Sequence, residues 1–113
     1  LVQSAFASSG IWIPRDAYQQ EKFCKTIALD LESLSKQIIP GDLIFFGSSK
    51  TCTHVGLHIE NGFYIHSSGA SDGHNGIEID GLFPKNLGNI ASFYRSKFRS
   101  AGRVISCYQS GKL

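Results

Sequence analysis

Histidine is the residue type in this chain whose number and spacing could do chemistry. Four histidines lie between positions 54 and 74: His54, His58, His66 and His74. An imidazole ring can bind a metal ion, transfer a proton as a general base, or make fixed hydrogen bonds inside a sheet. Each of these possibilities predicts different neighbours for the rings.

A metal site would combine the spacing Cys52-x-His54 with His58 and His66. Thiolate and imidazole are suitable zinc ligands. Structural zinc sites, however, usually bring paired ligands from both ends of the site, and none of the three cysteines has C-x-x-C spacing. We therefore rank zinc below the other two interpretations and predict no cofactor.

A purely structural role fits two of the four histidines well. His58 follows Gly56 on one face of an alternating strand, and His74 lies in a polar, glycine-rich loop. Half-buried strand histidines with satisfied hydrogen bonds are the common case for a single histidine. We expect neither His58 nor His74 to take part in chemistry.

His54 and His66 form the third candidate, a general base with an orienting partner. His54 opens one predicted strand, and His66 ends the strand that returns after Asn61-Gly62, a dipeptide typical of two-residue hairpin turns. A plain two-residue turn sets Leu57 opposite His66, which leaves His54 some three pairs away along the ladder. A bulge, which Gly56 invites, or a wider turn would shift this register.

A base of this kind needs a nucleophile, and the chain contains Cys24, Cys52 and Cys107. Catalytic cysteines typically lie at a helix N-terminus, where backbone amides and the helix dipole lower the thiol pKa. None of the three has that position. We expect Cys24 and Cys107 to be buried thiols, and Cys52 to be poorly placed to present its sulfur to the His54 ring.

The hydrophobic pattern predicts short helices first and strands afterwards. Helices are predicted over residues 1–6 and 17–25, the second capped by Asp16, whereas residues 26–39 fit both a strand and a helix. Strands are predicted over 43–46, 54–59, 63–67 and 76–80, with one or two more between 93 and 105. Helices followed by antiparallel strands predict the α+β class.

Composition limits the classes of function. With 113 residues, 42% hydrophobic and 18% charged, the chain is typical of one folded domain. The net charge of +2 comes from scattered basic residues, which argues against a nucleic-acid-binding face. No apolar run approaches the roughly 20 residues of a membrane-spanning helix. The sequence does not predict an oligomeric state.

Several short segments are specific when their order is taken together. They are Leu1-Val2-Gln3, Gly10-Ile11, Pro14-Arg15, Pro40-Gly41-Asp42-Leu43-Ile44-Phe45-Phe46, His54-Val55-Gly56-Leu57-His58-Ile59, Asn61-Gly62, Ile65-His66-Ser67-Ser68, Tyr94-Arg95-Ser96-Lys97-Phe98 and Ala101-Gly102-Arg103-Val104-Ile105. In this order the chain resembles the NlpC-type cell-wall cysteine endopeptidases. The resemblance implies a single domain over residues 1–113 with a papain-like α+β fold, in which N-terminal helices precede a mostly antiparallel sheet of about five or six strands.

The resemblance also implies a reaction. Members of that family hydrolyse peptide bonds in peptidoglycan stems, typically between D-glutamate and a diamino acid. By their motif, His54 is the general base and His66 orients it, so the hairpin must be bulged or have a longer turn. The implied partner is a peptidoglycan stem peptide, and the implied location is the bacterial cell envelope.

The chain departs from the family pattern at its start. The family's nucleophile is the cysteine of an Asp-Cys-Ser-Gly motif immediately before the Leu-Val-Gln segment, and this chain begins at that segment. No capping residue precedes Leu1, so we expect the first helix to continue upstream. We therefore expect an endopeptidase in the intact protein and no activity of this chain alone. The alternative is a non-catalytic cell-wall binding or regulatory module with the same fold.

Overall fold

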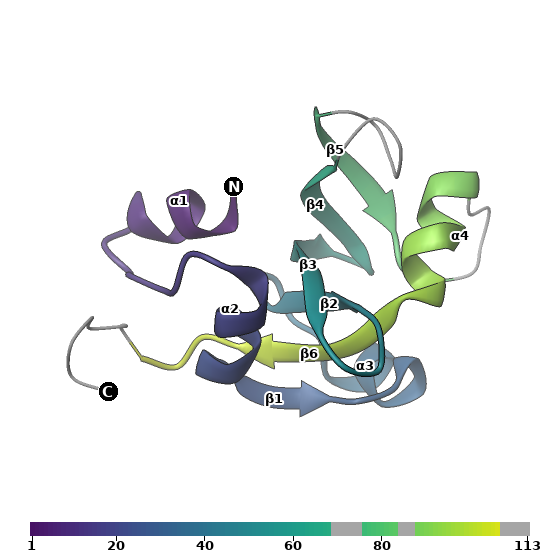
Figure 1. Ribbon diagram of the computed structural model, residues 1–113, viewed down its shortest axis with the longest axis horizontal. Helices are drawn as coiled ribbons and strands as arrows, with labels where there is room; N and C mark the ends of the chain where they lie inside the picture. Colours follow the sequence, from purple (N-terminus) through teal and green to yellow (C-terminus); the bar gives the residue numbers. More distant parts are fainter. Residues whose placement is uncertain (69–75, 84–87, 107–113) are drawn as a thin grey trace.

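Six strands form one antiparallel sheet in the computed structural model of the chain, in the order β1-β6-β2-β3-β4-β5 (Figure 1). The structure describes residues 1–68, 76–83 and 88–106, so His74 and Cys107 lie outside the described residues. The strands are β1 (Lys25–Ala28), β2 (Leu43–Gly47), β3 (Cys52–Glu60), β4 (Phe63–Ser68), β5 (Gly76–Gly81) and β6 (Phe98–Arg103). The helices are α1 (Val2–Ala7), α2 (Ala17–Phe23), α3 (Leu31–Gln37) and α4 (Asn89–Ser96). The predicted α+β class is confirmed.

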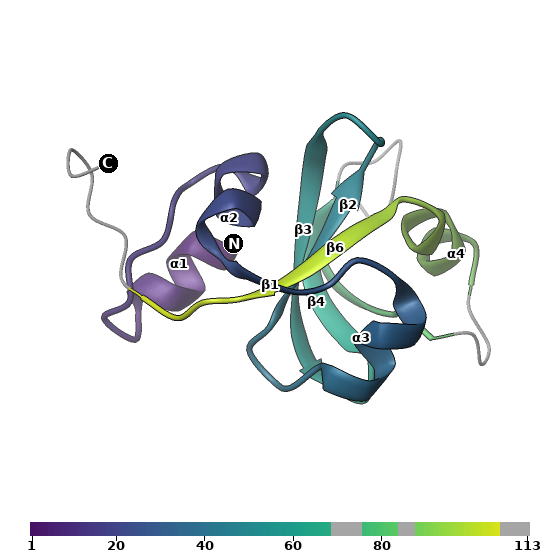
Figure 2. The ribbon, with the colours of Figure 1, turned by 90° about the horizontal axis from the view of Figure 1, so that it is seen from below.

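Strand β2 carries the core on both of its faces. Leu43 and Phe45 belong to an apolar cluster with residues of α1 and α2, whereas Ile44 and Phe46 belong to a second cluster with residues of α3 and α4. Figure 2 shows the same division, with α1 and α2 on one side of the strands and α3 and α4 on the other. All four side chains are at most 1% exposed, as the apolar run predicts for a strand buried on both faces.

The N-terminal helices have nearly the predicted bounds. Helix α2 ends at Phe23, because Lys25 already pairs with Arg103 in the sheet. The predicted cap is wrong in one respect: Asp16 occupies the N-cap position, but its side chain makes no capping hydrogen bond. Gln20 fixes the preceding connector instead, since its buried Nε2 donates to the carbonyls of Pro14 (2.9 Å) and Arg15 (3.2 Å).

The ambiguous segment from 26 to 39 contains a strand and then a helix. Strand β1 ends at Ala28, and α3 begins after Asp30, whose side chain accepts a hydrogen bond from the Ser33 amide at 2.7 Å. This bond satisfies one of the amides that a helix start leaves without an internal partner. The two periodicities in the sequence therefore belong to two consecutive elements.

The C-terminal part confirms the prediction in one respect. One closing strand, β6, lies between 93 and 105, but the first residues of that range belong to a helix, α4. Ile90, Ala91 and Tyr94 face the core from α4 at helical spacing. Strand β6 then lies between β1 and β2, so the sheet is not a simple meander. None of the helices in the described ranges is long and apolar enough to span a membrane.

Candidate active site

A bulge in β3 determines how the hairpin presents its histidines. The ladder pairs Glu60 with Phe63 but His58 with Tyr64, so β3 holds one extra residue at Ile59. The bulge therefore lies next to the turn and not at Gly56. The expected pairing of Leu57 with His66 is wrong, because Leu57 pairs with Ile65.

This shift by one residue brings His54 and His66 to the same face of the sheet. Continuing the observed register by one step sets His66 opposite Gly56, two residues from His54. Residues two apart on a strand point to the same face, so the two histidines are diagonal neighbours, a separation that long side chains can bridge. Without the bulge their rings would lie on opposite faces.

The two rings are in direct hydrogen-bond contact. His54 Nε2 lies 2.7 Å from His66 Nδ1, and the ring planes are inclined by 80°. On its other side, His66 Nε2 lies 2.6 Å from Asp80 Oδ2 on β5. The His66 side chain is fully buried and that of Asp80 is 10% exposed. Three side chains from three adjacent strands thus form one continuous chain of hydrogen bonds.

Asp80 belongs to this chain of hydrogen bonds but was not among the site residues predicted from the sequence. It pairs with Tyr64 in the ladder, two steps from the pair formed by His66 and Glu78 and on the same face of the sheet. The alternation Ile77-Glu78-Ile79-Asp80 places both carboxylates on one face of β5, which was the available signal. Which of the two carboxylates contacts His66 depends on the register of β4 against β5.

Aromatic side chains surround the two histidines. Tyr94 of α4 stacks on the His54 ring, with centroids 4.6 Å apart, and meets the His66 ring edge to face at 5.0 Å. The ring centroids of Tyr64 and His66 are 4.8 Å apart. A side chain at Gly56 would displace this packing, because a Cβ atom there would come 2.5 Å from Cδ2 of Tyr64. The glycine therefore allows the Tyr64 ring to lie over the strand beside His66.

His58 has the structural role that was expected of it. Its Nδ1 donates to the carbonyl of Ile39 (2.9 Å), and its Nε2 accepts from the amide of Gly62 (3.0 Å). Both ring nitrogens are thus bonded to the backbone, and the ring ties the turn before β2 to the hairpin turn after β3. The ring is buried, with only 3% of the residue exposed.

The described cysteines are not placed for catalysis. Burial, with the charge of Asp42, raises the pKa of the Cys24 thiol to about 12. Burial, with the charge of Glu21, raises the pKa of Cys52 to about 11, and its thiol donates to the backbone carbonyl of His54. Both side chains lie in the cluster with Leu43, on the opposite face of the sheet from the core that contains Tyr94.

The zinc hypothesis finds no support in this geometry. Cys52 lies in an apolar cluster, and both nitrogens of His58 are engaged by the backbone. Within the described ranges, no group of three or more His, Cys, Asp or Glu side chains could hold a metal ion. Cys52 and His58 therefore do not join His54 and His66 in one ligand set.

A pocket of about 240 Å³ opens beside His54. It is lined by residues of α1, the following connector, α2, β3 and β4: Leu1, Val2, Gln3, Ser4, Arg15, Ala17, Gln20, Thr53, His54, Val55 and Ser67. The start of α1 and His54 therefore line the same pocket.

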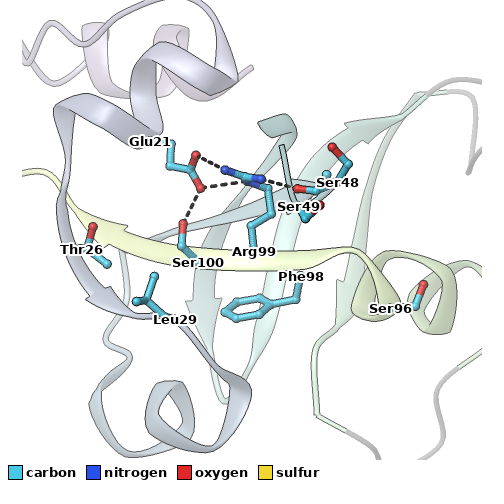
Figure 3. A pocket seen from close by; sticks show the side chains of 10 residues that line it. Glu21, Thr26, Leu29, Ser48, Ser49, Ser96, Phe98, Arg99 and Ser100 are labelled. Carbon is cyan, nitrogen blue, oxygen red and sulfur yellow. Dashed lines mark hydrogen bonds and ion pairs between the residues drawn. The ribbon is translucent and has the colours of Figure 1, made fainter. Parts of the chain in front are cut away.

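A second pocket, of about 560 Å³, lies between α2, β6 and the loop after β2 (Figure 3). None of the described residues that line it is a histidine. Arg99 donates to both carboxylate oxygens of Glu21, at 3.2 and 3.1 Å, and to the Ser48 carbonyl, and the Ser100 hydroxyl donates to Glu21 at 2.6 Å. Burial raises the pKa of Glu21, but the bonds from Arg99 and Ser100 outweigh it and lower the pKa below its ordinary value. The polar groups here bind one another.

Comparison with known proteins agrees with this geometry. The model of the NlpC/P60 family matches residues 1–87. The chain belongs to the NlpC/P60 family. Among curated relatives, it is 39% identical over 107 residues to the bifunctional muramidase/DL-endopeptidase CwlT of Bacillus subtilis, a match that covers 92% of the chain and 27% of CwlT. It is 26% identical over 106 residues to the murein DD-endopeptidase/LD-carboxypeptidase MepS of Escherichia coli, covering 93% of the chain and 47% of MepS.

Solved NlpC/P60 structures share the fold. An NlpC/P60 family protein from Bacillus cereus superposes with a TM-score of 0.69 at 27% identity, over 91% of this chain and 30% of that one. The peptidoglycan hydrolase RipB of Mycobacterium tuberculosis has a TM-score of 0.62 at 22% identity, over 92% and 42% respectively, which supports the fold alone. The chain thus spans less than half the length of each of the curated relatives and solved structures named here.

Proposed function

We propose that this NlpC/P60 chain is the catalytic domain of a peptidoglycan stem-peptide endopeptidase that cleaves the bond between D-glutamate and a diamino acid. In this proposal His54 is the general base and His66 orients it. The observation that carries the proposal is the 2.7 Å contact between His54 Nε2 and His66 Nδ1 beside the pocket at the start of α1. An imidazole held by a second polar group next to a binding pocket is suited to nucleophilic catalysis.

The bond specificity is supported by the names of the relatives. The relative named a DL-endopeptidase is 39% identical to the chain, and the relative named a DD-endopeptidase and LD-carboxypeptidase is 26% identical. The greater similarity is to the first, which favours a bond between a D- and an L-centre. Stem peptides of this kind lie outside the cytoplasmic membrane, so the proposed location is the bacterial cell envelope.

The nucleophile of the proposed reaction is a cysteine that precedes Leu1. Its thiol gives its proton to His54, and its sulfur attacks the carbonyl carbon of the substrate amide. The proton on His54 then passes to the amine nitrogen as the C–N bond breaks, which leaves a thioester. Water then gives a proton to His54 as its oxygen attacks the thioester carbon. His54 returns this proton to the sulfur as the C–S bond breaks, which restores the thiol and releases the substrate with a new carboxyl group.

The start of the first helix would also stabilise the transition state. Backbone amides at a helix N-terminus have no internal partner and point along the axis, toward any charge placed there. Each such donor to the developing oxyanion is worth on the order of 3 kcal/mol. Because neither Cys24 nor Cys52 can present a thiolate to His54, the 113-residue chain alone is expected to lack this activity.

The test uses the intact protein, including the residues encoded before Leu1. We expect it to cleave D-glutamyl–diamino acid bonds in purified stem peptides, and we expect His54→Ala to reduce cleavage by at least about 100-fold. Circular dichroism of the variant would verify that it is folded. Full activity in His54→Ala would contradict the assigned role. Binding of peptidoglycan without cleavage would instead identify the non-catalytic binding module.

A further inference from the structure

The carboxylate of Asp80 lies at the far end of the hydrogen-bond chain from the pocket. Asp80 pairs with Tyr64 across the β4–β5 ladder, and His66 pairs with Glu78, so Asp80 is the diagonal neighbour of His66. Its Oδ2 is 2.6 Å from His66 Nε2. The contact is shielded from solvent, since the His66 side chain is fully buried and the Asp80 side chain is 10% exposed.

The chemistry of these groups gives the chain a direction. An ionised carboxylate can only accept hydrogen bonds, so His66 must donate from Nε2. A neutral imidazole with its proton on Nε2 has a lone pair on Nδ1. In neutral His66, Nδ1 therefore accepts from its partner 2.7 Å away, and that partner, His54 Nε2, must carry a proton. Neutral His54 is then left with its lone pair on Nδ1.

We propose that Asp80 is a positioning residue that selects the tautomer of His54 through His66, and so places the basic lone pair on Nδ1. This inference rests on the proposed function of His54 as a base. A histidine can hold only one nitrogen toward its orienting partner, so the base must act through the other. Asp80 determines which nitrogen acts as the base, although two hydrogen bonds separate Asp80 from His54.

The hydrogen bonds keep the same donors and acceptors whether His54 is neutral or protonated. When His54 gains a proton on Nδ1, its Nε2–H still donates to His66, and His66 still donates to Asp80. No proton in the chain has to move during the reaction. If the direction were reversed, His66 would donate from Nδ1 to His54 Nε2. Neutral His54 would then carry its own proton on Nδ1, and that nitrogen could not accept a proton from the nucleophile.

An isosteric substitution separates this role from simple packing. In Asp80→Asn the side chain can accept through its oxygen or donate through its nitrogen, so it no longer imposes a direction. Glu78→Gln is the matched control, because it neutralises an exposed carboxylate on the same strand and opposite the same histidine. Backbone amide spectra would show that both variants keep the fold.

The decisive measurement is the protonation of the imidazole nitrogens in the intact protein with ¹⁵N-labelled histidine, at pH 8, where free imidazole with a pKa of about 6.5 is neutral. We expect His54 and His66 to be protonated on Nε2 in the wild type and in Glu78→Gln. We expect a mixture of tautomers in Asp80→Asn. A proton on His54 Nδ1 in the wild type would overturn the inference without any variant that might misfold. An unchanged tautomer in folded Asp80→Asn would also overturn it.

Steady-state kinetics of the same variants provide a second test. We expect Asp80→Asn to lower kcat by roughly 10- to 100-fold, the usual effect of removing the partner that orients a histidine, with KM within about twofold of the wild type. Glu78→Gln should leave both constants near their wild-type values. If the wild-type protein does not cleave stem peptides, the proposed function fails while the tautomer measurement still decides the inference. If cleavage depends on His54 but not on Asp80, only the inference fails.

Discussion

Tyr94 of α4 stacks on His54 of β3, with ring centroids 4.6 Å apart and planes inclined by 26°. The contact joins a helix to the strand that carries the proposed base, and it restricts the orientation of the imidazole. Tyr94 is 5% exposed, so the stacked face of the ring is covered.

Replacing this aromatic ring should impair catalysis. Tyr94→Leu keeps an apolar side chain but removes the stacking partner, and aromatic pairs contribute about 0.5–1.5 kcal/mol beyond burial. We expect kcat for stem-peptide cleavage by the intact protein to fall roughly threefold to tenfold. Tyr94→Phe retains the ring and should retain most of the activity. Full activity in Tyr94→Leu would show that the stacking does not orient the base.

Gly56 should not tolerate even a methyl group. A Cβ atom at this position would lie 2.5 Å from Cδ2 of Tyr64, whose ring is fully buried and cannot move away freely. We expect Gly56→Ala to lower the free energy of unfolding by about 1–3 kcal/mol, the usual effect of overpacking. Urea denaturation would measure it.

Gly88→Ala is the control for this substitution. A Cβ atom at Gly88 meets nothing within 4 Å, and its φ of −73° is open to any residue. Gly88 is the N-cap of α4, where alanine is less favourable than glycine, so a loss below about 1 kcal/mol is expected. Equal losses in the two variants would argue against a steric cause at Gly56.

Acid should weaken the contact between Glu21, Arg99 and Ser100. Because the folded pKa of Glu21 is lowered, the unfolded chain binds the proton more tightly. The stabilisation is therefore complete above the unfolded pKa of about 4.3 and is lost as the pH falls through the folded value. We expect wild-type stability to fall more steeply below pH 4.5 than that of Glu21→Gln, as followed by thermal unfolding.

Glu32→Gln is a suitable comparison for this experiment, because it removes one exposed carboxylate on α3 and leaves the Arg99 pair intact. It should show the wild-type loss of stability in acid. A Glu21→Gln variant whose stability falls as steeply as that of the wild type would contradict the assigned role of the pair.

The described cysteines should react slowly with alkylating reagents. With pKa values of about 12 for Cys24 and about 11 for Cys52, roughly one thiol in a thousand or fewer is ionised at pH 8. We expect iodoacetamide to modify both residues slowly in folded Cys107→Ser protein and rapidly after denaturation, as measured by mass spectrometry. Rapid modification of folded Cys52 would reopen its candidacy as a nucleophile.

Local signals in the sequence were sufficient for the hairpin. Asn61 and Gly62 have φ values of +51° and +81°, both positive, as the predicted two-residue turn requires. The apolar run of β2 and the hydrogen-bonded ring of His58 also agree with the sequence-based predictions. The turn and the buried strand depend on neighbours in the sequence or on burial, whereas the bond from His58 to Ile39 spans 19 residues and only the structural role of the ring was expected.

Features that depend on register could not be predicted in the same way. The bulge at Ile59 changes which residues oppose each other, and no periodicity reveals one extra residue in a strand. Asp80 became recognisable only when β4 and β5 were aligned. Residues 93–96 lie in α4 and not in the expected strand, because Phe93 and Phe98 favour strands by composition while the spacing of Ile90 and Tyr94 is helical.

Strand β6 is the last of the described strands to be synthesised, yet among them it is the only neighbour of β1 and also pairs with β2. The hairpins from β2 to β5, which carry His54, His66 and Asp80, can therefore assemble while β1 still waits for its partner. A polypeptide without residues 98–103 would leave the apolar edge of β2 unpaired, an open template for intermolecular strand addition. Loss of this one strand should thus yield aggregates rather than a slightly smaller folded domain.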